Sequence, residues 1–419
     1  MSEARADRVA IVGGLRTPFV KAGTAFRGHS ALDLAVHSVN GLVERHGLTR
    51  DSVQELAFGV VVVNPRMPHL ARELVFHSTL PPTVRTLTVT DNCITGISAI
   101  AVIYDAITSG RATCGIAGGV ESMSSPAVLF GEQGSGILLD AAHSKSTIER
   151  LKVLLRLRPS HFKPSPPELL EPSTGLSMGE HCELMVKEWN VSRTEQDEVA
   201  MRSHLRAYAA TLDGRLKQEI LPLDGIDQDL LIRSDSTLQK LAALSPVFNS
   251  GGSGTITAGN STPLTDGAAS VLLMSEDWAR RHGHHPLAFV HSFEFAGLSP
   301  SDGLLMGPAL AVPRLLRRSG LTLSNIDLVE MHEAFGGQVV CNLKAWRRGW
   351  KESAIGDVSE EKLNPLGGSL AVGHPFAATG VRIITTLANE MKRRNAKHGL
   401  ASVCGAGATA AAMLLERDG

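Results

Sequence analysis

Cys93 occupies a position at which a cysteine can act as a nucleophile. The β-branched stretch 87–90 predicts a strand and the small residues after Thr95 predict a helix, so Cys93 should lie where strand gives way to helix. Unpaired backbone N–H groups and the dipole at the start of a helix stabilise a thiolate. A buried structural cysteine is the alternative. With polar Asp91 and Asn92 beside it, we favour the nucleophile.

A second candidate is His374, in the glycine-rich and nearly uncharged loop 367–380. Pro375 follows it at a position suited to helix entry, and apolar residues with helical spacing continue to Met391. The cations at 392–394 suit a helix C-terminus. The loop is therefore predicted to present His374 just before a helix. The alternative is a tight turn containing a histidine with satisfied hydrogen bonds.

Two further reactive side chains, His332 and Cys404, follow predicted strands at 326–331 and 400–403. In open α/β sheets, sites form beyond the carboxyl ends of the strands. A histidine there can take the proton of one cysteine, whose thiolate attacks a carbonyl carbon. The second cysteine, with an ordinary pKa of about 8.5, can pass a proton to and from carbon. These residue types predict acyl transfer.

Backbone amides complete this predicted chemistry. The amides next to Cys93 and in the glycine-rich loop 405–407 can bind a negatively charged oxygen. A metal site is the competing use of cysteine and histidine, but no two of the four residues lie close together in the sequence. We therefore expect no metal.

The elements that must position these residues indicate an α/β fold in which one plan occurs twice. A strand, a polar or glycine-rich loop, a helix and a glycine-rich strand follow one another around Cys93, and again around His374 and Cys404. The helix after Cys93 should reach about Ser109. Buried strands are predicted at 9–14, 55–64 and 112–119, a capping box at Ser30 and Asp33 opens another helix, and a further helix is predicted at 309–318.

Residues 130–247 have a different character, with many charges and prolines, and we interpret them as an insertion between two layers of the main fold. Their basic amphipathic segment 147–162 can contact a membrane surface, a partner or an anionic substrate, or lie as a solvated helix over the core. After the insertion, residues 255–270 predict a strand, a polar loop and a helix of small residues, and 271–274 predict a strand.

Composition excludes several classes of function. Lys+Arg 41 against Asp+Glu 42 gives a formal charge of −1, so no overall field favours nucleic acid. Five cysteines without close pairs indicate reduced thiols and a cytoplasmic location, not a disulfide framework or a zinc knuckle. We find no secretory signal and no apolar run long enough to span a membrane.

Taken together, the motifs resemble the thiolase family over nearly the whole length. A histidine in His-Glu-Ala-Phe, where many thiolases have asparagine, makes the sequence most similar to the thiolase (beta) subunit of fatty-acid β-oxidation trifunctional complexes. The matching stretches are 13–19, Asn92-Cys93, 118–124, 258–261, 266–269, 332–335, 373–375 and 404–407.

The resemblance implies a role for each reactive residue. Cys93 matches the nucleophile that becomes acylated, and His374 matches the base that activates it. Cys404 matches the acid/base that protonates the departing acetyl-CoA enolate. His332 replaces the asparagine that helps to bind the thioester oxygen through water, so it would form an oxyanion hole with His374. The amides of Cys93 and Ala406 would form a second oxyanion hole.

The resemblance also implies substrate contacts. Thr262, Ser177 and Met178 match positions that contact coenzyme A, while Met306 and Phe335 match positions that line the acyl pocket. The sequence departs from the family in three places, none of which removes a catalytic residue. The loop after Cys404 is Gly-Ala-Gly-Ala-Thr-Ala in place of a richer glycine run, Thr262-Pro263 replaces a common Ser-Gly, and Ser177 replaces a common histidine.

The implied architecture is a thiolase-like fold of two similar five-stranded α/β halves, stacked in αβαβα layers, with an inserted loop domain. We expect residues 1–129 and 248–280 to form the N-terminal half, 130–247 the loop domain and 281–419 the C-terminal half. Acyl-CoA and CoA would be substrates, with no bound cofactor. The implied assembly is a homodimer or a dimer of dimers, with a possible hydratase/dehydrogenase subunit and peripheral membrane contact through the loop domain.

The predicted function is that of a 3-ketoacyl-CoA thiolase, which cleaves 3-ketoacyl-CoA with CoA by ping-pong catalysis on Cys93. One alternative is an acetyl-CoA C-acetyltransferase that runs the condensation for biosynthesis. A condensing enzyme that uses carrier-protein thioesters is disfavoured by the second cysteine. The alternative from a different class is a non-catalytic acyl-CoA-binding scaffold subunit.

Overall fold

The computed structural model describes residues 8–49, 51–165, 170–249 and 252–418. The N-terminal half contains a five-stranded sheet with the order β4-β3-β5-β8-β1, in which β3 is parallel to β4 and β5 while β8 is antiparallel to both of its neighbours. A short strand, β2, also pairs with β8. The bounds are Val9–Arg16 for β1, Val20–Lys21 for β2, Glu55–Gly59 for β3, Arg85–Val89 for β4, Cys114–Glu121 for β5 and Thr265–Ser275 for β8.

The C-terminal half repeats this plan with the order β10-β11-β12-β9. β10 is parallel to β11, and β12 is antiparallel to β11 and β9. The place of a fifth strand is taken by a single parallel bridge between Val329 and Leu363. β1 and β9 pair antiparallel and so join the two sheets. The bounds are Ala288–Gly297 for β9, Leu328–Met331 for β10, His398–Gly405 for β11 and Thr409–Glu416 for β12.

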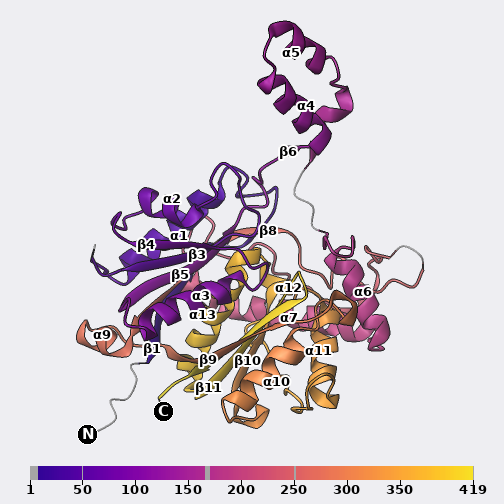
Figure 1. The fold of residues 1–419 in the computed structure, drawn as a ribbon. Coiled ribbons are helices and arrows are strands. Elements are labelled where there is room, and N and C mark those ends of the chain that lie inside the picture. The colour runs from indigo at the N-terminus through magenta and orange to yellow at the C-terminus, as the bar shows by residue number, and fades with distance from the viewer. Residues whose placement is uncertain (1–7, 50, 166–169, 250–251, 419) are drawn as a thin grey trace.

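Helices complete the predicted αβαβα layers (Figure 1). Helices α1 (Ala31–Arg45) and α2 (Leu70–His77) pack on the outer face of the first sheet, and α10 (Pro308–Arg318) packs on the outer face of the second. The central layer consists of α3 (Thr95–Thr108) and α13 (Phe376–Arg394). Each layer boundary has its own apolar cluster, which follows from the alternation of side chains along the strands.

Two glycines allow the central helices to cross closely. A Cβ at Gly96 of α3 would lie 2.7 Å from the backbone nitrogen of Val381, and a Cβ at Gly380 of α13 would lie 2.8 Å from that of Ile97. Backbone atoms cannot move aside as side chains can, so only glycine fits at either position. The close crossing brings together the helix starts that follow Cys93 and His374.

The structure corrects three of the predicted elements. The strand expected at the start of 255–270 is absent, and only Thr257 pairs there, in an isolated bridge with Pro246. The strand expected at 55–64 ends at Gly59, because residues 61–63 leave the sheet and line a pocket. The small residues at 267–270 do not form a helix; they belong to β8, which is buried along its whole length between β1 and β5. Small side chains suit that central strand, since a Cβ at Gly267 would lie 2.4 Å from the Phe19 ring.

The block between β5 and β8 has two parts. An arm of α4 (Glu132–His143), α5 (Thr147–Leu154) and η1 (Pro159–Phe162), based on the hairpin of β6 (Leu129–Phe130) and β7 (Pro164–Ser165), projects from the body (Figure 1). The rest packs against the C-terminal half, mainly through α6 and α7 against α11, and α7 against α12. These elements are α6 (Met178–Glu188), α7 (Arg193–Leu212), η2 (Leu216–Glu219), α8 (Leu238–Ala242), α11 (Gly336–Arg348) and α12 (Ser369–Val372).

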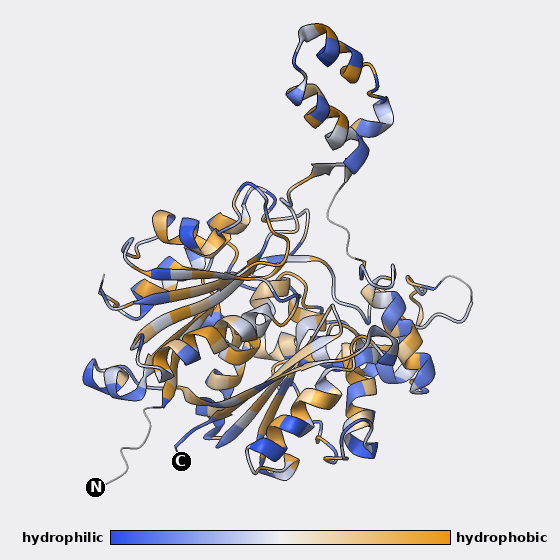
Figure 2. Cartoon of the chain, in the orientation of Figure 1, coloured by the Kyte–Doolittle hydropathy of each residue, from blue (hydrophilic) through white to orange (hydrophobic). Residues whose placement is uncertain are grey.

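The remaining short elements lie in the C-terminal half and at its junction with the first half: α9 (Glu276–Arg281), η3 (Pro300–Asp302) and η4 (Leu323–Asn325). Figure 2 shows apolar residues concentrated along the sheets and on the inner sides of the helices, with polar residues outside. Among the described residues, no helix is both long and apolar enough to cross a membrane.

Candidate active site

Cys93 lies in a tight turn between β4 and α3, as the sequence predicts. Asn92 adopts a left-handed conformation with φ 46°, which asparagine tolerates better than most residues. The Thr95 hydroxyl accepts a hydrogen bond from the Asp91 amide at 2.8 Å and donates to the Asn92 carbonyl at 2.6 Å. The Ser98 hydroxyl donates to the Asp91 carboxylate at 2.7 Å. These bonds fix the turn and so the position of the Cys93 thiol.

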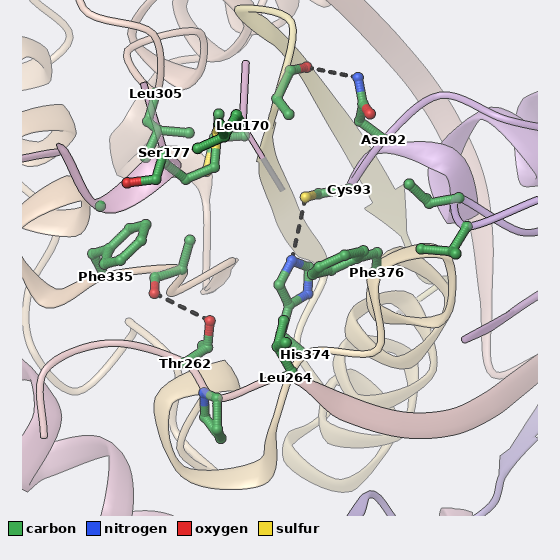
Figure 3. Close-up of a pocket in the computed structure, with 18 of the residues that line it drawn as sticks. Asn92, Cys93, Leu170, Ser177, Thr262, Leu264, Leu305, Phe335, His374 and Phe376 are labelled. Carbon is green, nitrogen blue, oxygen red and sulfur yellow. Dashed lines mark hydrogen bonds between the residues drawn. The ribbon is translucent and has the colours of Figure 1, made fainter. Parts of the chain in front are cut away.

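His374 faces this thiol across the central layer, with 3.2 Å between its Nε2 atom and the Cys93 sulfur (Figure 3). Its Nδ1 atom lies 2.6 Å from the Thr379 hydroxyl, which itself donates to the Pro375 carbonyl at 3.0 Å. Because that hydroxyl hydrogen is directed to Pro375, the network assigns the hydrogen of the neutral imidazole to Nδ1. Nε2 is then free to accept the proton of Cys93, as a general base must.

Burial dominates the electrostatics of Cys93 and His374. Burial raises the pKa of the Cys93 thiol to about 12, although the Ala406 amide donates a hydrogen bond to the sulfur and lowers it in part. Burial, with a smaller effect from the Arg382 cation, lowers the pKa of His374 to about 3. Both shifts favour a neutral thiol beside a neutral imidazole in the free protein. The thiolate must form as its proton passes to His374.

Cys404, at the end of β11, lines the same pocket as Cys93 and is only 1% exposed. Burial raises its pKa above the ordinary range for a thiol, and the neighbouring Cys93 adds to the effect. The loop after Cys404 is fixed by two long-range hydrogen bonds. The Asn92 side chain donates to the Ala406 carbonyl at 3.0 Å, and the Gly407 amide donates to the Glu171 carboxylate at 2.8 Å.

His332 follows β10 and is completely buried. Its ring centroid lies 4.2 Å from that of His374, so the structure brings the two predicted histidines into contact. It does not line the pocket itself. Its Nδ1 atom lies 2.8 Å from the Ser369 hydroxyl, and its Nε2 atom has no hydrogen-bond partner among the described residues.

A cavity of about 940 Å³ opens over Cys93, His374 and Cys404 (Figure 3). Four of the five residues predicted to contact substrate line it: Thr262, Ser177, Met178 and Phe335. The Thr262 hydroxyl donates to the Ala334 carbonyl at 3.3 Å, and Ser177 caps α6 through Glu180.

Met306 is a correction to the predicted acyl pocket. It does not line the cavity; its neighbour Leu305 does. Met306 is completely buried in the apolar cluster between the second sheet and its outer helices. Neighbouring residues of a loop point their side chains in different directions, and a match to a family motif does not show which of the two faces the pocket.

The sequence analysis did not identify several residues of the site. Glu121, at the end of β5, accepts hydrogen bonds from the amides of Val62 at 2.9 Å and Ala377 at 3.3 Å, and so ties the pocket wall to the start of α13. Thr379 could have been found from its spacing, five residues after His374 at the start of a helix. The apolar wall that the sequence analysis missed consists of Val61, Val62, Val63, Leu170, Phe248, Leu264 and Phe376.

The described residues include no group of three or more His, Cys, Asp or Glu side chains placed to hold a metal ion. Instead, Cys93 contacts His374 and the Ala406 amide, and Cys404 lines the same cavity. Such an arrangement suits covalent acyl transfer.

Comparisons with known proteins identify the family to which this chain belongs. The family model for the thiolase N-terminal domain matches residues 9–277, and that for the thiolase C-terminal domain matches residues 284–417. The chain therefore belongs to the thiolase family, and it is an acyltransferase.

Individual members of the family are similar to this chain over nearly its whole length. The chain is 43% identical over 425 residues to a 3-ketoacyl-CoA thiolase of Pseudoalteromonas translucida (strain TAC 125), covering 98% of this chain and 97% of the relative. It is 40% identical to a 3-ketoacyl-CoA thiolase of Colwellia psychrerythraea (strain 34H / ATCC BAA-681), covering 98% of each. The crystal structure of the Bacillus anthracis acetyl-CoA acetyltransferase superposes with a TM-score of 0.86 at 30% identity, over 98% of this chain and 99% of that one.

Proposed function

We propose that this protein is a 3-ketoacyl-CoA thiolase, which cleaves 3-ketoacyl-CoA with CoA to acetyl-CoA and a shortened acyl-CoA. The observation that supports this most directly is the contact of 3.2 Å between the Cys93 sulfur and His374 Nε2, with Cys404 in the same cavity. The names of relatives at 40–43% identity over nearly the whole chain point to the same reaction.

The first half-reaction begins with proton transfer from Cys93 to His374. The thiolate adds to the C3 carbonyl carbon, and the bond between C2 and C3 then breaks. Its electron pair stays on C2 as the acetyl-CoA enolate, which takes a proton from Cys404. The products are acetyl-CoA and a thioester between Cys93 and the shortened acyl group.

In the second half-reaction, CoA gives its thiol proton to the deprotonated Cys404 and attacks the thioester carbonyl. Acyl-CoA leaves, and Cys93 takes back the proton held by His374. The negatively charged carbonyl oxygen needs donors in both steps. The Ala406 amide already donates to the Cys93 sulfur, to which the acyl group would be attached, so it and the Cys93 amide suit the second oxyanion hole. His332 and His374 would form the first.

Two variants test this division of roles. Cys93→Ser should abolish acylation by any thioester. Cys404→Ala should still be acylated by acetyl-CoA but should fail to make or break the carbon–carbon bond. Acetyl-CoA formation from 3-ketoacyl-CoA and CoA, followed by mass spectrometry, measures the full reaction. Equal loss of both partial reactions in Cys404→Ala would contradict the proposal.

The geometry also suits the reverse condensation, because the same groups serve both directions. The structural similarity to an acetyl-CoA acetyltransferase favours keeping that activity as the second candidate. A purified sample supplied with acetyl-CoA alone should then form acetoacetyl-CoA in amounts set by the equilibrium. A non-catalytic scaffold would form no covalent adduct in either direction.

We also propose that the arm contacts an anionic membrane surface. Ile148, Leu151 and Leu155 are 60–77% exposed on and after α5. The same segment has a strong positive charge from Lys145, Arg150, Lys152, Arg156, Arg158 and Lys163. Exposed apolar and basic side chains together favour an anionic lipid surface. Co-sedimentation with vesicles containing anionic lipid, but not with neutral vesicles, is expected, and binding to neither would exclude this role.

For assembly, we propose a cytoplasmic homodimer or dimer of dimers, with a hydratase/dehydrogenase subunit as a possible partner. The five cysteines are all free, which is consistent with a reducing compartment. β4 is an edge strand on which Leu87 is 40% exposed, and such an edge is suited to pairing with a second chain. Light scattering of the purified protein would measure the oligomeric state, and a monomer at micromolar concentration would refute the proposal.

A further inference from the structure

His332 is connected to a buried polar network that the reaction described above does not use. The network lies between β10, α12 and α13 and comprises Glu330, Ser369 and Arg382, all buried. Glu330 is two residues before His332, so both belong to the same face of this strand and its extension, toward α13. A guanidinium group is rarely buried this completely unless it is paired with polar or charged groups.

The hydrogen bonds in this network have defined directions. Arg382 donates to the Ser369 hydroxyl oxygen at 2.8 Å, and its other terminal nitrogen lies 3.5 Å from the Glu330 carboxyl. A guanidinium group can only donate, so Ser369 must accept from it. The Ser369 hydroxyl hydrogen remains available, and His332 Nδ1 lies 2.8 Å away.

His332 is also held in its neutral form. Burial lowers the pKa of His332 well below 6.5, and the neighbouring His374 and the Arg382 cation lower it further. A neutral imidazole has one donor nitrogen and one acceptor nitrogen. If Nδ1 accepts from Ser369, the ring hydrogen must be on Nε2.

We propose that Ser369, oriented by Arg382, is a positioning residue that fixes His332 as the Nε2–H tautomer and so makes it a hydrogen-bond donor that acts on the substrate thioester oxygen through water, since the ring itself does not line the cavity. Nε2 is buried and has no hydrogen-bond partner among the described residues, so it is available for such a water. The inference rests on the proposed function, because it needs a thioester oxygen to be stabilised.

The two neighbouring histidines then have opposite tautomers. In His374 the hydrogen is on Nδ1 and Nε2 accepts the proton of Cys93. In His332 the hydrogen is on Nε2, which donates. Thr379 and Ser369 account for the difference. The Thr379 hydroxyl donates its hydrogen to the Pro375 carbonyl, so it can only accept from His374. The Ser369 hydroxyl oxygen accepts from Arg382, so the Ser369 hydroxyl hydrogen remains for His332.

A histidine at position 332 needs Ser369 to fix its tautomer, whereas an asparagine there would not. An asparagine side chain has its donor and acceptor on different atoms and needs no proton to be placed. The effect of Ser369 should therefore depend on the residue at position 332. A residue that merely supports the fold would have the same effect in either background.

The first measurement is the ¹⁵N spectrum of histidine-labelled wild-type protein, which reports which nitrogen of each neutral ring is protonated. We expect His332 to be protonated on Nε2 and His374 on Nδ1, with assignment by single histidine variants. A His332 ring protonated on Nδ1 would overturn the proposal. This result does not depend on activity, so it remains valid if the thiolase reaction itself is not observed.

The second measurement is a double-mutant cycle on carbon–carbon cleavage. Ser369→Ala should lower kcat about 10-fold or more while KM for CoA changes less than about twofold, because the lost donor acts on the developing oxyanion. In a His332→Asn background, the same substitution should change kcat less than about twofold. Equal loss in both backgrounds would show a structural role only.

A matched control is Ser402→Ala. Ser402 is equally buried on the neighbouring strand β11, and its hydroxyl has no hydrogen-bond partner in the described part of the protein. Removing it should leave kcat within about twofold of wild type. A loss in Ser402→Ala as large as that in Ser369→Ala would also overturn the proposal, since it would show that any polar deletion in this layer disturbs the site.

Discussion

Replacement of Thr379 by valine tests whether His374 needs an assigned tautomer to act as a base. Valine has nearly the shape of threonine and lacks the hydroxyl. In the wild type, Thr379 is completely buried and its hydroxyl lies 2.6 Å from His374 Nδ1. The substitution leaves the Nδ1 hydrogen without a partner and no longer disfavours the other tautomer, in which Nε2 cannot accept the proton of Cys93.

The size of the effect follows from the burial of both groups. A buried donor left without its hydrogen bond costs about 1–3 kcal/mol. If that cost appears in the transition state for acylation, where the imidazole gains a proton and must keep its orientation, the rate falls about 5- to 150-fold. Substrate binding makes no use of Nδ1, so KM should change much less than kcat.

The assay is the rate of acyl transfer from acetyl-CoA to Cys93, followed by rapid quenching and intact mass. Thr385→Val is the matched control: it removes a buried hydroxyl from the same helix, but that hydroxyl has no hydrogen-bond partner among the described residues. We expect Thr385→Val to acylate at close to the wild-type rate. If Thr379→Val also acylates at the wild-type rate, the assignment of His374 as an Nδ1–H base is wrong.

Three further predictions concern the scaffold. Gly380→Ala should destabilise the protein by about 1–3 kcal/mol in chemical denaturation, since the new Cβ meets backbone atoms of α3. Gly136→Ala is the control: its new Cβ has no atom within 4 Å, so it should stabilise α4 slightly. Burial raises the pKa of Glu121 to about 7, so the folded protein favours the protonated carboxyl. Its contribution to the unfolding free energy should be full below pH 4.5 and should fall by up to about 3 kcal/mol as the pH rises to 7. Glu121→Gln should lack this change. Leu305→Ala should alter KM values for acyl-CoA, whereas Met306→Ala should cost about 2–5 kcal/mol of stability with little change in KM.

Much of the fold could be predicted from local pattern. The turn at Cys93 and the helix after His374 both appear where the sequence places them, because a β-branched run, a polar loop and helical spacing act within a few residues. The repeated plan of the two halves is confirmed by their common strand order. The wrong helix at 267–270 arose because small residues favour a helix locally, while two flanking strands and the Phe19 ring decide the outcome.

The site was predicted less completely, for a physical reason. Cys93, His374, Cys404 and His332 can be singled out because their side chains are reactive, and the structure brings them together. The residues that set their protons cannot, because serine, threonine and arginine are common and act here only through contacts across the fold. The start of a helix at Cys93 can be read from the sequence, but the depth of burial that raises the pKa of its thiol cannot.

The most direct test of the account is the intact mass of the protein after mixing with a 3-ketoacyl-CoA, followed by peptide mapping. The account predicts one acyl group on Cys93, removed when CoA is added and absent in Cys93→Ser. An adduct on another residue, or a protein that releases acetyl-CoA without any covalent intermediate, would contradict it.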